Sequence, residues 1–547
     1  MANSHFPSTS MYFFTHRRTP DVNGKSCVVC KKPSEQSCSL CYQVYYCSKE
    51  HQIQDWKNGH KSNCAPYKIA TSDVLGRYLI STCDISEGKV IMQRKPLVIC
   101  PKVVSFALCL GCHKKLNPSG EFYACSSCNW PLCGIHCEDT NLHKEECAVF
   151  TKNSFRPQIS TRNVKQSCYA IIGPLRALLL KEKSKSKFEA LMAMQSNLEN
   201  HRNSALYMAL KQNVVPTIVN KLKVNTNAEE ILNICSIFDT NAFDVRDSKG
   251  LVNVRALYST VSFIPHDCKQ NTRHYFTDDD FEIYVSATVP IKKGEMITTS
   301  YTQSLWGTLA RRKHLKQSKH FDCVCNRCKD PTEFGLYVGS IYCSSCRETD
   351  KTASCPKIIS TEPLNANADF KCEKCDHVIV AKQIAWGNDA LRNEILSLEK
   401  TYPNCFEAFL EKYKDLLHST NAHALEVKYA LSQMYGNLNG YNIYDISDEL
   451  LQRKIDLCHE LLEVADVLSP GSSRFRGSLL YDLQAAMVVQ TRRNYEQEKI
   501  TKQAANENLR EAIKILQEST KILSVESDMK ELLEKRLEHL SKYLDLE

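Results

Sequence analysis

Residues 27–64 read CVVCKKPSEQSCSLCYQVYYCSKEHQIQDWKNGHKSNC, with cysteines and histidines at the spacing C-x2-C-x7-C-x2-C-x5-C-x3-H-x8-H-x3-C. Eight side chains in this stretch can bind a metal: Cys27, Cys30, Cys38, Cys41, Cys47, His51, His60 and Cys64. Two CxxC pairs followed by a Cys-x3-His and a His-x3-Cys supply enough soft ligands for two closed tetrahedral sites. We therefore predict that this stretch folds as a finger around two zinc ions.

A second cysteine-rich run nearly repeats this arrangement, at the spacing C-x2-C-x12-C-x2-C-x4-C-x3-C-x5-H-x3-C. Its eight candidate ligands are Cys109, Cys112, Cys125, Cys128, Cys133, Cys137, His143 and Cys147. His136 lies beside Cys137 and is an alternative ligand, so the choice between them stays open. The run predicts a second two-zinc finger.

Two more clusters follow. In FDCVCNRC, three cysteines (Cys323, Cys325 and Cys328) are too close together for more than one metal, so a fourth ligand must come from elsewhere. Then two CxxC pairs separated by 25 residues, Cys343–Cys346 and Cys372–Cys375, are typical of a zinc ribbon. A catalytic zinc keeps an open coordination position, whereas every cluster here can supply four ligands. The zinc is therefore predicted to be structural, and the chemistry to lie elsewhere.

Composition points to a compartment that keeps thiols reduced. The chain has 547 residues, 28 cysteines and a formal net charge of +8. No apolar run approaches the roughly 20 residues of a membrane span, and the first 20 residues lack the apolar segment of a secretory signal. We expect a cytoplasmic and/or nuclear protein with no membrane association, whose repeated CxxC pairs bind zinc rather than form disulfides. The modest charge and the absence of a recognition-helix pattern in either finger argue against direct nucleic-acid binding.

Strand and helix patterns separate the rest of the chain into regions. LGRYLISTCDISEGKVIMQRKPLVICP alternates short apolar strands with turns, and IYVSATVPIKKGEMITTSYTQ repeats that style much later. Between them KFEALMAMQSNLENHRNSALYMALKQ has helical apolar spacing at Phe188, Leu191, Met194 and Leu198. After about Ala381 helical periodicity dominates, without a strict 34-residue repeat. A β domain interrupted by a finger and by helices is thus expected to precede an all-helical region.

Six short segments occur in the order found in a known protein family: LGRYL, TNAFDVRD, LYSTVSFIPHDCKQNT, ATVPIKKGEMITTSYT, RRKHL and FDCVCNRC. Together with the first finger they resemble the SET and MYND domain (Smyd) protein-lysine methyltransferases, most closely the arthropod SmydA branch. The resemblance implies an α+β multidomain fold. Its regions would be an N-terminal tail (1–26), a MYND finger (27–64), a SET domain (65–320) carrying a second MYND-like finger (109–147) and a helical insert (153–222), a post-SET zinc segment with the ribbon (321–380), and a helical, TPR-like domain (381–547).

The resemblance also implies the site. SET proteins transfer a methyl group from S-adenosylmethionine to a substrate amine, usually that of lysine. Tyr301 matches the tyrosine that faces the transferred methyl. The cofactor contacts would be Gly76, Arg77, Asn241, His266, Asn271 and Phe321. Cys268 would complete the cluster of Cys323, Cys325 and Cys328, which makes about six structural zinc ions in all. In the first finger, Cys27, Cys30, Cys47 and His51 would share one zinc, and Cys38, Cys41, His60 and Cys64 the other.

Two departures from the family pattern support an alternative. Pro265 stands where the family has an asparagine that contacts the cofactor, and it lacks both the side-chain amide and a backbone N–H. Tyr78 stands where active relatives commonly have a second glycine in the opening turn. The first hypothesis is a methyltransferase acting on a lysine-bearing histone or non-histone protein. The alternative is a catalytically silent SET scaffold that acts as a zinc-finger adaptor and binds proline-containing peptides of regulatory partners. The MYND finger would bind such peptides or transcriptional regulators.

Overall fold

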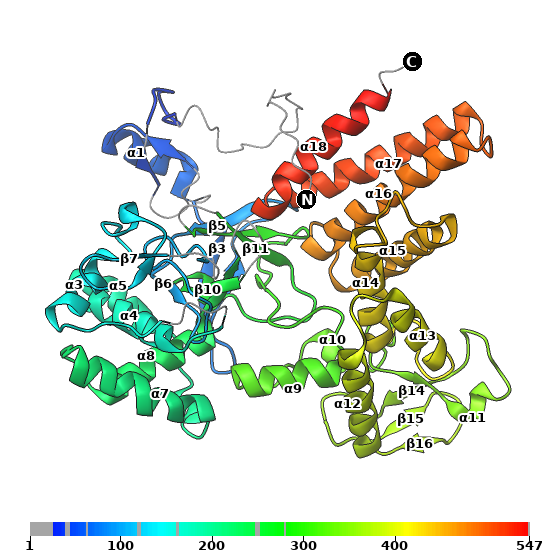
Figure 1. The fold of residues 1–547 in the computed structure, drawn as a ribbon, viewed down its shortest axis with the longest axis horizontal. Coiled ribbons are helices and arrows are strands. Elements are labelled where there is room, and N and C mark those ends of the chain that lie inside the picture. Colours follow the sequence, from blue (N-terminus) through cyan, green and yellow to red (C-terminus); the bar gives the residue numbers. More distant parts are fainter. Residues whose placement is uncertain are drawn as a thin grey trace. The chain divides into compact units, whose positions relative to one another are not determined.

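The computed structural model describes residues 26–34, 36–38, 44–61, 64–116, 122–159, 164–246, 252–277 and 281–544. The chain divides into two compact units, Met1–Pro66 and Tyr67–Glu547, which are described separately. Figure 1 shows strands and helices in both units, with the helices dominating toward the C-terminus. The predicted α+β class is confirmed.

The first unit is the finger, built from very short elements. Strands β1 (Gln36–Ser37) and β2 (Tyr45–Tyr46) pair antiparallel and precede helix α1 (Lys49–Asp55). Ser48 starts this helix by accepting a hydrogen bond from the backbone N–H of His51. Its buried hydrophobic core contains only Cys38, Tyr46 and Cys64 among the described residues. So small a core needs a further source of stability, which closed zinc sites supply.

The second unit begins with three small antiparallel sheets. The first pairs β3 (Tyr67–Ser72) with β4 (Gly76–Ser81). The second has the strand order β6 (Val98–Pro101), β10 (Val252–Leu257), β9 (Phe243–Arg246). The third has the strand order β11 (Thr272–Phe276), β12 (Ile283–Ala287), β5 (Val90–Arg94). In the third sheet Thr272 faces Ala287 and Val285 faces Met92. Strands far apart in the sequence therefore meet, and they carry the loops that hold the predicted site.

The second finger is part of the core of this unit. It contains β7 (Tyr123–Ala124), β8 (Pro131–Leu132) and the start of α3 (Lys144–Lys152). Trp130 is fully buried, and its ring stacks on that of Phe150 with centroids 5.3 Å apart. The same hydrophobic cluster continues through the sheets and the neighbouring helices. This finger is thus held by packing as well as by its ligands, unlike the first finger.

A group of helices follows the second finger: α4 (Ile172–Lys183), α5 (Lys185–Met192), α6 (Leu198–His201), α7 (Ala205–Pro216) and α8 (Ala228–Asn241). The apolar spacing that predicted one helix through Leu198 is interrupted, because α5 ends at Met192 and Asn197 adopts a left-handed φ of 52°. Carbonyl groups in the break accept hydrogen bonds from Arg77, Thr240 and Asn241 instead of from helical N–H groups. Tertiary contacts therefore outweigh helix propensity here.

Helix α9 (Thr308–Lys319) leads through α10 (Asn326–Lys329) to a four-stranded antiparallel sheet around the ribbon cysteines. Its strands are β13 (Ile341–Tyr342), β14 (Lys357–Ser360), β15 (Phe370–Cys372) and β16 (Val378–Ile379), and the short helix α11 (Ser344–Arg347) follows β13.

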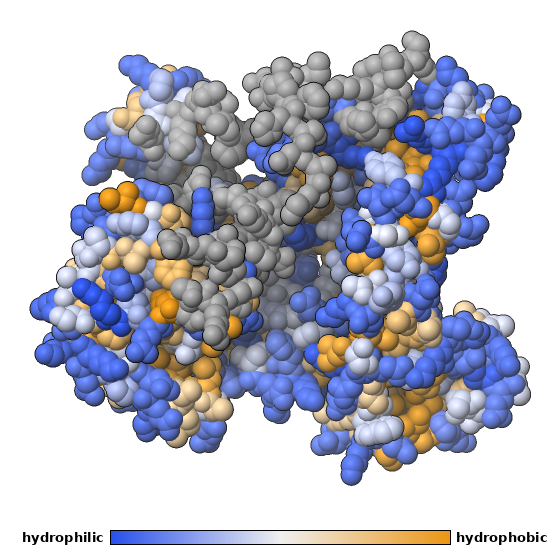
Figure 2. Space-filling view, in the orientation of Figure 1, coloured by the Kyte–Doolittle hydropathy of each residue, from blue (hydrophilic) through white to orange (hydrophobic). Residues whose placement is uncertain are grey.

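Helices α12 (Ala381–Ser397), α13 (Pro403–Tyr413), α14 (Ala422–Asn437), α15 (Asp448–Leu468), α16 (Arg474–Glu496), α17 (Lys502–Leu523) and α18 (Ser527–Leu544) complete the chain. Each from α13 onward packs on the next. Helix α15 buries one apolar face, made of Leu451, Ile455, Cys458, Leu461 and Ala465. Across the described helices, none combines the length and the apolar composition that crossing a bilayer requires. Figure 2 accordingly shows hydrophilic residues over much of the face in view, with hydrophobic residues in smaller patches.

The turn between α15 and α16 attaches the helices to the strand region. Gly471 has a φ of 67°, and a Cβ atom there would lie 2.0 Å from the Thr288 carbonyl oxygen. The Ser472 backbone N–H donates to that same oxygen at 2.8 Å, and the Ser472 hydroxyl donates to Glu87 at 2.6 Å. Only glycine fits so close an approach with this backbone conformation.

Candidate functional site

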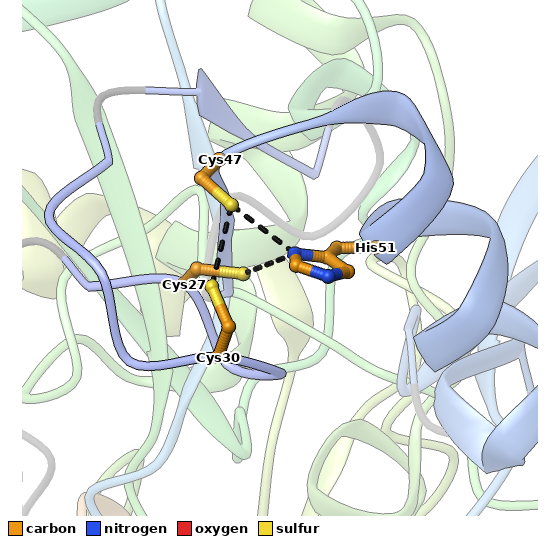
Figure 3. A group of neighbouring side chains, drawn as sticks. All are labelled: Cys27, Cys30, Cys47 and His51. Carbon is orange, nitrogen blue, oxygen red and sulfur yellow. Dashed lines mark hydrogen bonds between the residues drawn. The ribbon is translucent and has the colours of Figure 1, made fainter.

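The first finger brings four predicted ligands together, as Figure 3 shows. The sulfur of Cys30 lies 3.4 Å from that of Cys47, and the His51 Nδ1 atom lies 3.1 Å from the Cys47 sulfur and 3.5 Å from the Cys27 sulfur. A Zn–S bond of about 2.3 Å in a tetrahedral site separates the sulfur atoms by about 3.8 Å. The group therefore has the composition and the size of a zinc site.

The second site of this finger is described only in part. The sulfur atoms of Cys38 and Cys64 lie 3.3 Å apart, which suits two ligands of one ion. His60 is nearby in the chain and its Nδ1 atom lies 3.9 Å from the Asp55 carboxylate. Cys41, the fourth predicted ligand, lies outside the described residues, so its role stays a prediction.

The second finger contains two groups with the same interleaved order. One consists of Cys109, Cys112, Cys133 and Cys137, and the other of Cys125, Cys128, His143 and Cys147. The His136 Nε2 atom lies 3.7 Å from the Cys133 sulfur but is not a member of either group. The geometry thus favours Cys137 over His136 as the ligand.

Cys268 meets the post-SET cysteines, as the resemblance implied. Its sulfur lies 3.9 Å from that of Cys323 and 3.6 Å from that of Cys328, and Cys325 completes the group. The ribbon forms a further group of Cys343, Cys346, Cys372 and Cys375, with sulfur separations of 3.5 and 4.0 Å. With these groups the described residues contain six candidate Cys/His zinc sites.

Sequence reasoning missed the charges around the post-SET group. Arg311 is fully buried and points its Nε atom at the Cys268 sulfur, 3.2 Å away, and its Nη1 atom at the Glu333 carboxylate, 2.6 Å away. Arg327, also fully buried, donates to the same carboxylate at 2.9 Å. Four thiolates around one Zn²⁺ carry a net charge of −2, so the net +1 of the two arginines and Glu333 partly compensates it. The phrase RRKHL had marked Arg311 only as part of a family motif.

Seven cysteines stay outside these groups: Cys83, Cys100, Cys168, Cys235, Cys355, Cys405 and Cys458. Cys100, Cys235, Cys355 and Cys458 are buried free thiols, and the other three are partly buried. Desolvation raises the pKa of the Cys235 and Cys458 thiols to about 12, which keeps them protonated and unreactive.

Tyr301 lies among aromatic side chains beside the Cys268 loop. Its hydroxyl donates to the Ile264 carbonyl oxygen at 2.6 Å, and its backbone N–H donates to the His266 Nδ1 atom at 3.0 Å. The ring of Phe321 lies 6.5 Å from that of Tyr301 and 6.0 Å from that of His266. Burial raises the pKa of Tyr301 above its ordinary value, so the phenol stays neutral. The structure therefore brings together three of the seven residues predicted for catalysis and cofactor binding.

Two more of the seven residues, Arg77 and Asn241, both bind the segment between α5 and α6. Arg77 donates to the Ala193 carbonyl oxygen and places its guanidinium 4.0 Å from the centre of the Phe263 ring. The Asn241 amide donates to the Gln195 carbonyl oxygen at 2.7 Å. No sequence pattern predicts this link, because the carbonyl groups belong to a segment whose apolar spacing is typical of a helix.

Gly76, at the start of β4, has a φ of 63° and nothing within 4 Å of the position of a Cβ atom. Such an open, left-handed position leaves room for another group to approach the backbone.

The side chain of Asn271, in contrast, already makes hydrogen bonds within the protein. Its amide donates to the Met296 carbonyl oxygen at 2.8 Å, and its side-chain oxygen accepts from the Thr298 backbone N–H at 2.8 Å. Asn271 therefore stabilises the segment 296–298. That it also contacts a cofactor stays a prediction.

Pro265 keeps the backbone arrangement of its loop. Its carbonyl oxygen accepts from the Thr299 backbone N–H at 3.0 Å, and the Asp267 N–H donates back to the Thr299 carbonyl oxygen at 3.0 Å. These bonds fix the loop against the segment that carries Tyr301. The proline therefore removes a side-chain donor without displacing the loop from that segment.

Comparison with known proteins places these residues in a family. The MYND finger model matches residues 27–64, and the SET domain model matches residues 76–302. SmydA-8 isoform A of Drosophila melanogaster, a SET domain-containing protein, is 30% identical over 336 residues, which cover 60% of this chain and 69% of the relative. The chain belongs to the SET and MYND domain (Smyd) family.

Other relatives of this Smyd chain are named as enzymes. Histone-lysine N-methyltransferase ASHR1 of Arabidopsis thaliana is 29% identical over 316 residues, covering 55% of this chain and 62% of the relative. Histone-lysine N-methyltransferase Smyd1 of Mus musculus is 21% identical over 398 residues, covering 68% and 73%. Among solved structures, Rubisco LSMT bound to AdoMet aligns with 90% of this chain and 93% of its own at 12% identity, but the TM-score of 0.25 is too low to support an argument.

The Smyd residues present suit a methyl donor such as S-adenosylmethionine. The backbone at Gly76 is open to an approaching group. The rings of His266, Tyr301 and Phe321 lie near one another and offer aromatic surface of the kind a nucleoside needs. Hydrogen bonds within the protein already use the Asn271 amide, and Pro265 supplies none. The site thus fits the group with fewer polar contacts than the family pattern.

Proposed function

We propose that this protein is an S-adenosylmethionine-dependent protein-lysine N-methyltransferase. The observation that carries the proposal is the position of Tyr301 between the His266 loop and Phe321, in a chain whose SET domain relatives are named as lysine methyltransferases. Gly76, Arg77, Asn241, His266, Asn271 and Phe321 would hold the cofactor. When bound, S-adenosylmethionine supplies a methyl group on a positively charged sulfur.

Tyr301 would orient the reacting groups. Its hydroxyl hydrogen is used in the bond to the Ile264 carbonyl oxygen, so the phenolic oxygen presents only lone pairs to its other neighbours. These lone pairs can accept a hydrogen bond from a substrate amine and attract a polarised methyl group. Because the phenol stays neutral, its oxygen is a weak nucleophile and would not compete with the substrate amine for the methyl group.

The surroundings would also select the reactive form of the substrate. Methyl transfer needs a neutral amine aligned with the bond that breaks, and alignment can supply several kcal/mol of the barrier. A lysine entering a buried, aromatic environment loses hydration, which lowers its pKa and favours the neutral amine. Binding a lysine-bearing segment of a protein would therefore align its amine and favour the form that has lost its proton to water.

The test begins with calorimetric titration of S-adenosylmethionine into the zinc-loaded full-length protein, followed by Tyr301→Phe. We expect micromolar binding to both proteins, because the hydroxyl faces the reacting atoms rather than the nucleoside. Transfer of a labelled methyl group to core histones or fractionated cell proteins should fall by about 10- to 100-fold in the variant, as one oriented contact is lost. The proposal fails if the wild-type protein binds no cofactor at millimolar concentration.

Two observations favour a second candidate function, that of an adaptor. Pro265 removes a cofactor contact, and the first finger is a compact unit of its own. These features favour a zinc-finger adaptor that binds proline-containing peptides of regulatory partners while the SET domain acts as a scaffold. Full-length protein should then retain immobilised proline-rich peptides, and Cys47→Ser, which removes a ligand of the first finger, should abolish retention. If neither protein binds such peptides, the adaptor function is excluded.

A further inference from the structure

Lys319 is the last residue of α9, and its ammonium group lies beside the proposed active site. Its Nζ atom donates to the Thr240 carbonyl oxygen at 2.7 Å and lies 3.4 Å from that of Asp239. These carbonyls belong to the last turn of α8, immediately before Asn241. Lys319 is two residues from Phe321, and its Nζ atom lies 5.8 Å from the centre of the Tyr301 ring. The ammonium group thus lies near the ring of Tyr301, at the end of the helix that carries Asn241.

Burial lowers the pKa of Lys319, and the carboxylates of Asp239 and Asp244 lie close enough to offset part of that lowering within the described parts of the chain. Lys319 forms no ion pair there, and the nearby Asp239 carboxylate is engaged with Arg255 at 3.0 Å. Carbonyl groups at the C-terminal end of α8 also stabilise the cation, since Lys319 donates to two of them. Two other lysines of α9 differ, because Lys316 pairs with Asp322 and Lys313 is exposed to solvent. A partly buried, unpaired positive charge therefore remains close to Tyr301.

Such a charge acts differently on the two forms of the cofactor. The sulfur of S-adenosylmethionine is a cation, whereas that of S-adenosylhomocysteine is neutral, and the two molecules are otherwise alike. Two like charges about 12 Å apart at an effective dielectric constant of about 20 change a dissociation constant roughly tenfold, and at about 6 Å roughly a hundredfold. Because Tyr301 is proposed to face the transferred methyl, the sulfonium would lie within this range of Lys319.

We propose that Lys319 is a specificity-determining residue that weakens binding of the sulfonium cofactor relative to its neutral thioether product. This inference rests on the proposed methyltransferase function and describes a property of the same site. It makes the enzyme retain S-adenosylhomocysteine after transfer, so product inhibition would be strong and turnover would depend on removal of the product.

The experiment compares the ratio of the two dissociation constants, Kd for S-adenosylmethionine over Kd for S-adenosylhomocysteine, by calorimetry on the full-length protein. In Lys319→Gln and Lys319→Met this ratio should fall on the order of tenfold. Lys319→Arg keeps the charge and Lys313→Gln removes an exposed charge from the same helix, so both should keep the wild-type ratio. Comparing a ratio cancels any general loss of affinity caused by removing the bond to α8.

The outcomes separate the two proposals. If every protein binds both molecules but the ratio is unchanged in Lys319→Gln and Lys319→Met, the role of Lys319 is overturned while the proposed function stands. If no protein binds either molecule, the methyltransferase function fails and the role of Lys319 fails with it. Binding of S-adenosylmethionine that appears only after Lys319 is neutralised would support the role of Lys319 but would count against methyl transfer by the wild-type protein.

Discussion

At the scale of single residues, Pro265 leaves its loop in place but removes hydrogen-bond donors from it. Its carbonyl oxygen keeps the bond to Thr299 that any residue could make, so the loop lies beside Tyr301 in spite of the substitution. What the proline lacks is a donor, both on its backbone and on its side chain. A departure from the family motif therefore changes the expected affinity for the cofactor without disturbing the local fold.

Replacing this proline should strengthen cofactor binding. In Pro265→Asn the restored amide should lower the dissociation constant for S-adenosylmethionine by about two- to a hundredfold, corresponding to about 0.5–3 kcal/mol for a hydrogen bond. Pro265→Ala is the matched control, because it restores the backbone N–H but not the side-chain amide. Equal calorimetric affinities for the asparagine and alanine variants would argue against a side-chain contact at this position.

At the scale of elements, the sequence predicted the type of most segments but not where one helix stops. The apolar spacing at Phe188, Leu191 and Met194 is correct as a burial pattern, since all three are buried. It cannot reveal that α5 ends at Met192, because the reason lies in distant donors such as Arg77 and Asn241. Cysteine spacing, in contrast, predicted the zinc groups well, because four ligands of one ion must converge whatever the intervening fold.

The turn between α15 and α16 is an element whose geometry can be tested directly. Gly471→Ala places a Cβ atom against the Thr288 carbonyl oxygen, so the turn must move away and the Ser472 bonds must break. Gly440→Ala is a close control, because Gly440 also has a positive φ (82°) but nothing within 4 Å of its Cβ position. Limited proteolysis should release the helical region of the Gly471 variant at least several times faster than that of the Gly440 variant. Equal rates would show that the turn does not attach this region.

At the scale of the whole molecule, candidate zinc sites are distributed over both units of the chain. The first finger has a hydrophobic core of only three buried residues among those described, whereas the second finger shares the large core of the SET region. Removing zinc should therefore unfold the first finger before the second. The post-SET group differs from both, since Cys268 joins it to the loop that contains His266.

The metal content and the effect of one ligand can be measured together. Elemental analysis of the purified protein should give about six zinc ions per chain, and Cys323→Ser should lose about one. The same variant should lose binding of S-adenosylmethionine, because the loop of Cys268 is no longer fixed beside Tyr301. Cys405→Ser alters a cysteine outside the six groups and should change neither quantity. Normal cofactor affinity in Cys323→Ser would contradict the link between this zinc and the site.

The spacing of the post-SET ligands also has a consequence for protein synthesis. Cys268 leaves the ribosome 60 residues before Cys328, and at about 5–20 residues per second this interval lasts roughly 3–12 s. During that time the thiol of Cys268 has no metal partner, and its loop must stay unlocked. The first finger, whose ligands span residues 27–64, can close long before. During synthesis the post-SET zinc group can therefore be completed only after Cys328 has emerged, later than the first finger.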